Sequence, residues 1–215
     1  MDQQHPSPSR WAIVLAGGEG TRMQPLVHRW LGFNRPKQYC AFVGSRSMFQ
    51  HTVDRAALVT APERIVAVVG RDHRDEILTQ LQGRTIGQVI YQPRNCETAA
   101  GLFLPLTYIH ARAPGATVVI FPSDHFIHPE DRFLAAVCRM AGLAETMPDR
   151  LVLLGIRPDR LEMEYGWILP GTALSSPEEA PICEVHSFME KPSRIQAVKA
   201  FRHGALWNTF VFAAR

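Results

Sequence analysis

A glycine-rich run and two cations near the N-terminus have the residue types needed to bind phosphate. The run comprises Leu15, Ala16, Gly17, Gly18, Gly20, Thr21 and Arg22. Glycine has no Cβ, so backbone N–H groups in such a run can approach phosphate oxygens closely. Arg22 offers a forked donor, and Lys37, further along the chain, offers a point charge. We therefore expect an anion cradle here; a glycine-rich turn with two surface cations is the alternative.

Two common phosphate-binding motifs do not fit this run. A P-loop ends in Gly-Lys followed by Ser or Thr, and the run has no such ending. A dinucleotide-binding fingerprint needs a third glycine where Met23 stands. The cradle must therefore belong to another class of phosphate-binding protein.

A carboxylate follows a later apolar segment. Asp124 lies in the sequence Phe121-Pro122-Ser123-Asp124-His125, directly after a predicted buried strand. Open α/β sheets bind ligands outside the carboxyl ends of their strands, so a carboxylate there is well placed to hold a Mg²⁺ bound to phosphates. We predict that Asp124 is a metal ligand; a helix-capping or loop-stabilising role is the alternative.

These residues need a fold that brings strand ends together, and the apolar pattern predicts one. We expect strands at 11–16, 64–70, 88–92, 117–121 and 151–156, and helices at 47–59, 72–81, 98–110 and 130–147. Strands that alternate with helices of this length predict an α/β fold with a mostly parallel sheet covered on both faces.

The pattern changes after residue 156. Segments rich in Pro, Gly and Ser at 157–181 accompany shorter apolar runs. We expect strands at 165–169, 184–189 and 206–213, with a helix at 193–203. We interpret this half as a modified α/β layer that builds a substrate pocket on the sheet.

Composition narrows the class of protein. With 215 residues, of which 46% are hydrophobic and 20% charged, the chain has the size and composition of one α/β domain, which we expect to span 11–215. No segment reaches the roughly 20 apolar residues of a membrane span, and no basic run or aromatic-basic stripe indicates nucleic-acid binding. The four cysteines have no metal-ligand spacing. Residues 1–10 are polar and rich in Pro, so we expect a disordered lead-in to a cytoplasmic protein.

The glycine-rich run and the residues after it resemble a known family. The sequence AGGxGTRxxPL at 16–26, followed by PKQ at 36–38, resembles the N-terminal region of the sugar nucleotidyltransferases, and PKQ favours the mannose-1-phosphate guanylyltransferases. The resemblance implies a three-layer α/β/α Rossmann-like nucleotide-diphospho-sugar transferase fold. It also implies that the loop wraps a nucleoside triphosphate, that Arg22 contacts the outer phosphates, and that Lys37 contacts phosphate near the reacting centre. Asp124 matches the metal-binding Asp of the family's P-[SA]-D-H motif.

Base recognition is implied by a third segment, whose match is imperfect. Gln92, Asn95 and Thr98 lie in a sequence that resembles the family's QPxNRxTAPG segment, which approaches the nucleotide base. Cys96 stands where the family often has Arg, and Glu97 adds a carboxylate. These differences leave the identity of the base open.

Sugar recognition is implied by three short elements near the end of the chain. Segments around Gly166, Glu190 and Asn208 resemble the family's YGYI, EKP and WNSG elements, in the family's order. Glu190, Asn208 and the backbone at Gly166 would bind sugar hydroxyls, and Lys191 would bind the sugar phosphate.

The resemblance implies an enzyme that uses Mg²⁺ to transfer GMP from GTP to mannose 1-phosphate, forming GDP-mannose and pyrophosphate. The alternatives are UTP or dTTP with glucose 1-phosphate, or a catalytically weak nucleotide-binding relative. Family members continue beyond WNSG with a second acidic metal ligand. Either this chain is a shortened form, or the second ligand comes from elsewhere. We expect the chain to bind nucleotide but to turn over slowly, with an uncovered sheet edge or apolar face that favours a homo-oligomer.

Overall fold

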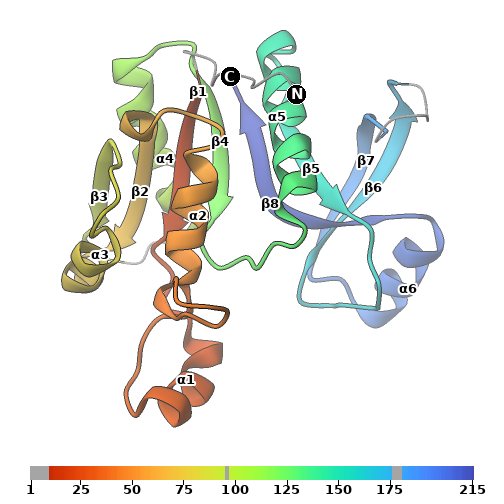
Figure 1. Cartoon of the computed structure of the whole chain (residues 1–215). Coiled ribbons are helices and arrows are strands. Elements are labelled where there is room, and N and C mark those ends of the chain that lie inside the picture. Colours follow the sequence, from red (N-terminus) through yellow and green to blue (C-terminus); the bar gives the residue numbers. More distant parts are fainter. Residues whose placement is uncertain (1–9, 95–96, 176–180) are drawn as a thin grey trace. The chain divides into compact units, whose positions relative to one another are not determined.

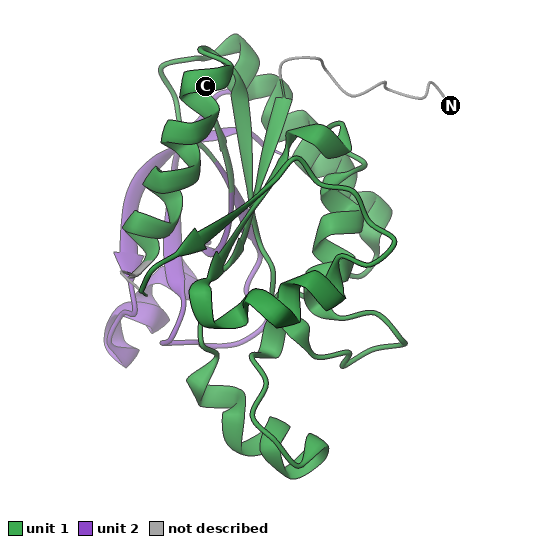
Figure 2. Ribbon diagram, turned by 90° about the vertical axis from the view of Figure 1, so that its left-hand side faces the viewer, with its two compact units in different colours: residues 1–152, 212–215 green, residues 153–211 purple. Residues whose placement is uncertain are grey.

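Two compact units make up the described part of the chain. The computed structural model describes residues 10–94, 97–175 and 181–215. Unit 1 contains the described residues up to Val152 together with Phe212–Arg215, and unit 2 contains those of Leu153–Val211 (Figure 2). Apart from Arg10, the predicted lead-in lies outside the described residues, and so do Asn95 and Cys96 of the predicted base-binding segment.

Unit 1 is built on a parallel sheet in the strand order β3-β2-β1-β4. The strands are β1 (Arg10–Ala16), β2 (Ile65–Gly70), β3 (Gln88–Gln92) and β4 (Thr117–Pro122). β1 pairs in parallel with both β2 and β4, and β2 pairs with β3. The strand order reverses between β1 and β4, which is the switch point where open α/β sheets bind ligands. The loops after β1 and β4 therefore leave the sheet side by side.

Helices cover both faces of this sheet (Figures 1 and 2). On one face, Ile109 of α4 (Glu97–Arg112) joins a buried cluster with Ile13 and Val66. The opposite face carries α2 (Met48–Ala56) and α5 (Glu130–Thr146) (Figure 1). The remaining helices of unit 1 are α1 (Gln24–Leu31) and α3 (Arg74–Gln80).

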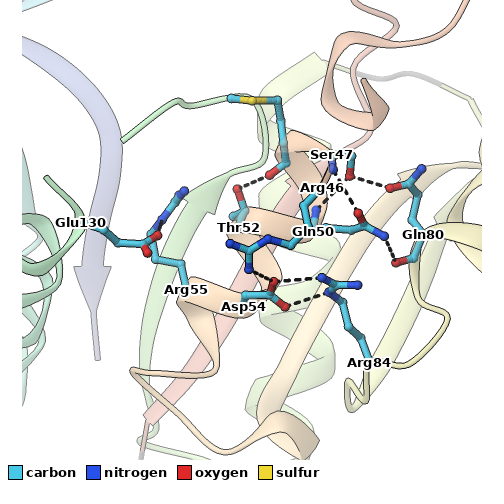
Figure 3. A network of polar contacts seen from close by, with 10 residues as sticks. Arg46, Ser47, Gln50, Thr52, Asp54, Arg55, Gln80, Arg84 and Glu130 are labelled. Atoms are coloured by element: carbon cyan, nitrogen blue, oxygen red, sulfur yellow. Dashed lines mark hydrogen bonds and ion pairs between the residues drawn. The ribbon is translucent and has the colours of Figure 1, made fainter. Parts of the chain in front are cut away.

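A polar network holds α2 against its neighbours (Figure 3). Asp54 accepts hydrogen bonds at 2.8 Å from both Arg46 and Arg84. The buried Arg55 donates to Glu130, the first residue of α5, at 2.8 Å. The network therefore fixes α2 relative to the start of α5, whose preceding loop leads back to the end of β4.

Unit 2 is antiparallel. β6 (Gly166–Ala173) pairs with β7 (Cys183–Glu190) and with β8 (Leu206–Ala214), while β5 (Val152–Ile156) pairs with β8. The short helix α6 (Arg194–Arg202) packs its small residues on the tryptophans of β6 and β8. The last residues of β8 belong to unit 1, where 212–214 pair antiparallel with 118–120 of β4.

All of the predicted strands and helices are present, with bounds that differ by a few residues. The predicted mostly parallel sheet with helices on both faces is confirmed in unit 1. Helix α1 was not predicted; it has only eight residues, of which only Val27 is buried. No helix among the described residues is long and apolar enough to cross a membrane.

Candidate functional site

The loop after β1 needs glycine for different reasons at different positions. Gly20 has φ +64°, and a Cβ there would lie 3.1 Å from the backbone nitrogen of Lys37. A Cβ on Gly17 would lie 2.5 Å from Oε1 of Gln92, so the glutamine would have to move. A Cβ on Gly18 would meet nothing within 4 Å. Packing within the protein therefore does not explain glycine at position 18, where the backbone faces open space.

Three backbone amides of the same loop have no acceptor among the residues that the structure describes. Across the described ranges, no hydrogen bond is donated by the N–H groups of Gly18, Glu19 or Gly20. Several N–H groups on a short loop after a strand form a concave anion site. This geometry is what the predicted phosphate cradle requires.

The side chain of Gln38 binds the carbonyl groups of the same loop. Its Nε2 donates to the carbonyl oxygens of Ala16 at 3.0 Å and Gly18 at 2.7 Å. Sequence reasoning did not include Gln38 among the site residues, although the PKQ motif places it directly after Lys37.

Lys37 and Asp124, predicted from distant segments, form an ion pair. Nζ of Lys37 lies 2.5 Å from Oδ2 of Asp124. Burial by itself would raise the pKa of Asp124, but the hydrogen bond and the charge of Lys37 outweigh it, so the pKa of this carboxyl is lowered. Ser123 holds the loop in place, because its Oγ donates to the carbonyl of Leu15 at 2.6 Å. The carboxylate is therefore ionised at neutral pH and held where β1 and β4 end.

The donors around Asp124 match only part of a metal site. In the described part of the chain, no group of three His, Cys, Asp or Glu side chains converges. Nε2 of His125 lies 4.0 Å from Oδ1 of Asp124, and burial lowers the pKa of His125, so this imidazole is neutral at pH 7. Nucleotide sites often hold Mg²⁺ through one or two carboxylates together with substrate phosphates. A single carboxylate therefore fits a Mg²⁺ that is carried by a triphosphate.

The other predicted residues of unit 1 lie on the surrounding elements. Gln92, at the end of β3, is buried against Gly17. Thr21 and Arg22 are exposed in the 3₁₀ turn that follows the loop. Thr98 is exposed in the first turn of α4, one residue inside the helix.

In unit 2, three of the four predicted sugar-binding residues converge across three strands. Gly166 pairs with Glu190 between β6 and β7. The register of β6 and β8 places Gly166 opposite Asn208. A Cβ on Gly166 would lie 2.9 Å from Oε2 of Glu190 and 3.3 Å from Cβ of Asn208. Glycine therefore allows these two polar side chains to lie close to the backbone of β6.

The pleat of β8 separates the two members of the WN element. Trp207 is buried with Trp167 beneath α6, whereas Asn208 lies on the opposite face with Gly166. Lys191, which follows β7, is exposed and has φ +45°, a conformation that is uncommon for a residue with a Cβ. Its N–H donates to the carbonyl of Tyr165 at 3.3 Å.

The loop amides have no acceptor in the described ranges, and a cation and a carboxylate lie with them at the carboxyl ends of parallel strands. This arrangement is typical of α/β proteins that bind nucleotide phosphates. The particular family follows from sequence comparison. The chain belongs to the nucleotidyl transferase family, whose model matches residues 11–215. The predicted family resemblance and fold class are thereby confirmed.

Several named relatives match most of the chain. The xanthan biosynthesis protein XanB of Xanthomonas campestris pv. campestris is 33% identical over 206 residues, which cover 94% of this chain and 41% of XanB. The mannose-1-phosphate guanylyltransferase of Escherichia coli strain K12 is 30% identical over 210 residues, or 95% of this chain and 42% of that protein. The chain thus spans about two fifths of the length of these curated relatives.

A solved structure has the same fold. The crystal structure described as mannose-1-phosphate geranyltransferase from Thermus thermophilus superposes with a TM-score of 0.80 at 30% sequence identity. The match covers 96% of this chain and 57% of that one.

Proposed function

We propose that this chain transfers GMP from GTP to mannose 1-phosphate, releasing pyrophosphate and forming GDP-mannose. The observation that carries the proposal is the Lys37–Asp124 pair next to the open amides of the glycine loop. The PKQ and WN elements support the choice of GTP and mannose 1-phosphate, as does similarity to a relative named mannose-1-phosphate guanylyltransferase.

The reaction needs little acid–base chemistry. An oxygen of the sugar phosphate, already ionised at neutral pH, attacks the α-phosphorus of GTP in line. The bond from the α-phosphorus to the bridging oxygen breaks, and its electron pair leaves with pyrophosphate. Catalysis then consists of positioning and charge neutralisation. The loop amides would hold the outer phosphates, and Arg22 would neutralise the charge that develops on the leaving group.

Lys37 and Asp124 would exchange partners when nucleotide binds. Each neutralises the other in this structure. A triphosphate offers Lys37 a new acceptor, which frees the Asp124 carboxylate for the cation that accompanies the phosphates. Bound Mg²⁺ would supply neutralisation of the phosphate charge. Before nucleotide binds, Lys37 and Asp124 thus both stay charged, because each is paired with the other.

The residues of unit 2 would bind the sugar phosphate. Glu190 and Asn208, which lie beside Gly166, can accept from and donate to hydroxyl groups. Lys191, the next residue after Glu190, would pair with the phosphate.

Pyrophosphate release tests the proposal. The chain is incubated with Mg²⁺ and either GTP plus mannose 1-phosphate or UTP plus glucose 1-phosphate, and Lys37→Ala serves as the control with reduced activity. We expect release with the first pair. Release with only the second pair would assign another base and sugar, and GTP binding without release from either pair would favour the nucleotide-binding relative.

A further inference from the structure

We propose that Gln38 is a positioning residue that aims the amides of the glycine loop at the phosphates of the nucleotide. This inference rests on the proposed function, since it concerns the same nucleotide site. Gln38 would orient the loop and would not touch the phosphates, because its side chain faces away from the open space beside Gly18.

The contacts of Gln38 require a nitrogen that carries at least two N–H donors. The residue is 3% exposed, and its Nε2 donates to both Ala16 and Gly18 of the loop. Backbone carbonyls only accept hydrogen bonds, so only a side chain with two N–H donors on one nitrogen can serve both in this way. A carboxylate of the same shape would place an acceptor against two acceptors.

Because the peptide bond is planar, these contacts with the carbonyls also determine where the loop N–H groups point. In a planar trans peptide, the N–H points opposite to the C=O of the preceding residue. The only cis peptide in the described residues lies at His128-Pro129, so the loop peptides are trans. With the carbonyls of Ala16 and Gly18 turned toward Gln38, the N–H groups of Gly17 and Glu19 point away from it. Gln38 thereby turns donors toward the side where a phosphate would bind.

The same short turn also positions the cation. Gln38 lies in the 3₁₀ turn Lys37–Tyr39, between the lysine that pairs with Asp124 and the tyrosine whose hydroxyl donates to Ala16 at 3.3 Å. A shift of this turn would therefore move the cradle and the cation together. Gln38 connects the two parts of the predicted phosphate site.

Substitution of Gln38 by Met keeps the length and burial of the side chain but removes the donor. Thr60→Val is the matched control, because the fully buried Thr60 donates through Oγ1 to the carbonyl of Arg10, at the other end of the same strand. Binding of GTP with Mg²⁺ is measured by calorimetry, and unfolding by denaturant. We expect both variants to lose stability, but only Gln38→Met to lose GTP affinity, by tenfold or more.

Gln38→Glu supplies a second readout that packing alone would not change. Its carboxylate repels both carbonyls at neutral pH, whereas the protonated acid can donate to one of them. GTP affinity relative to the wild type should therefore recover partly as the pH falls from 7 to 5. If Gln38→Met binds GTP as tightly as Thr60→Val, or if Gln38→Glu shows no recovery, Gln38 has no positioning role. If the wild-type chain fails to bind GTP at all, the proposed function itself is wrong.

Discussion

At the residue scale, two charged groups of the predicted phosphate site, Lys37 and Asp124, are already paired within the protein. The hydrogen bond and charge of Lys37 more than offset the burial that would raise the pKa of Asp124. Arg22, the other cation of the predicted site, lies on the exposed turn after the loop. We assign phosphate contacts to both cations.

Removal of either cation should lower activity without unfolding the chain. We expect Arg22→Ala and Lys37→Ala to reduce pyrophosphate release roughly ten- to a hundredfold, because one charge-assisted contact contributes about 1.5–3 kcal/mol. The control is Arg150→Ala, which removes an exposed arginine in the turn after α5. Wild-type turnover in either site variant would show that its cation does not contact the phosphates.

The lowered pKa of Asp124 predicts a pH-dependent contribution to stability. A carboxyl whose pKa is lowered by folding stabilises the protein above its unfolded pKa of about 4, and this stabilisation is lost as the pH falls through the lowered folded pKa. Denaturant unfolding of the wild type and Asp124→Asn should therefore differ most near pH 7 and converge toward pH 3. A difference that stays constant with pH would contradict the ion-pair assignment.

At the scale of elements, strand ends and strand register bring the candidate residues together. The loops after β1 and β4 are adjacent because those strands are paired. In unit 2, Gly166, Glu190 and Asn208 meet because β6 lies between β7 and β8. Gly18 faces open space, whereas Gly166 allows neighbouring side chains to approach the backbone closely.

Gly18→Ala separates ligand binding from packing. The added methyl group meets nothing within 4 Å, and position 18 does not have a positive φ, so the free energy of unfolding should be unchanged or slightly higher. We expect GTP affinity to fall nonetheless, because the Cβ would keep phosphate away from the amides. Gly142→Ala in α5, where the added Cβ also meets open space, is the control and should leave GTP affinity unchanged.

Gly166→Ala should weaken binding of the sugar phosphate and not binding of GTP. Its Cβ would lie 2.9 Å from Oε2 of Glu190 and 2.8 Å from Cζ of Phe188, so the carboxylate would be displaced. We expect the KM for mannose 1-phosphate to rise, with GTP affinity unchanged. In the control Gly171→Ala, on the same strand, the nearest atoms to the added Cβ lie 3.4 Å away. The KM for mannose 1-phosphate and the affinity for GTP should therefore stay at their wild-type values. If the KM for mannose 1-phosphate rose equally in both variants, Gly166 would not belong to the sugar site.

At the scale of the whole molecule, the two kinds of candidate residue are divided between the units. The predicted phosphate residues belong to unit 1, and the predicted sugar residues belong to unit 2. Nucleotide binding should therefore be measurable without the sugar phosphate.

Ligand-linked stability provides that measurement. A ligand at 100 times its Kd stabilises the state that binds it by about 2.7 kcal/mol. With Mg²⁺ present, we expect GTP to raise the thermal midpoint more than UTP at equal concentration. A larger rise with UTP would contradict the guanine assignment while leaving the phosphate site intact.

The sequence by itself determined the class of fold and most of the local structure. Apolar runs and helical spacing located the strands and helices, because these patterns depend on neighbouring residues. The motifs that resemble the family also identified Lys37, Asp124 and Gly166 as candidate site residues. Their roles with ligands remain predictions.

Only the tertiary structure decided how those candidates are combined. It paired Lys37 with Asp124, turned Gln38 onto the loop carbonyls, and brought Asn208 beside Gly166 and Glu190. It also made β8 antiparallel to β4. Each of these outcomes depends on which distant segments become neighbours, and between strands also on their register. Local sequence patterns do not encode that information.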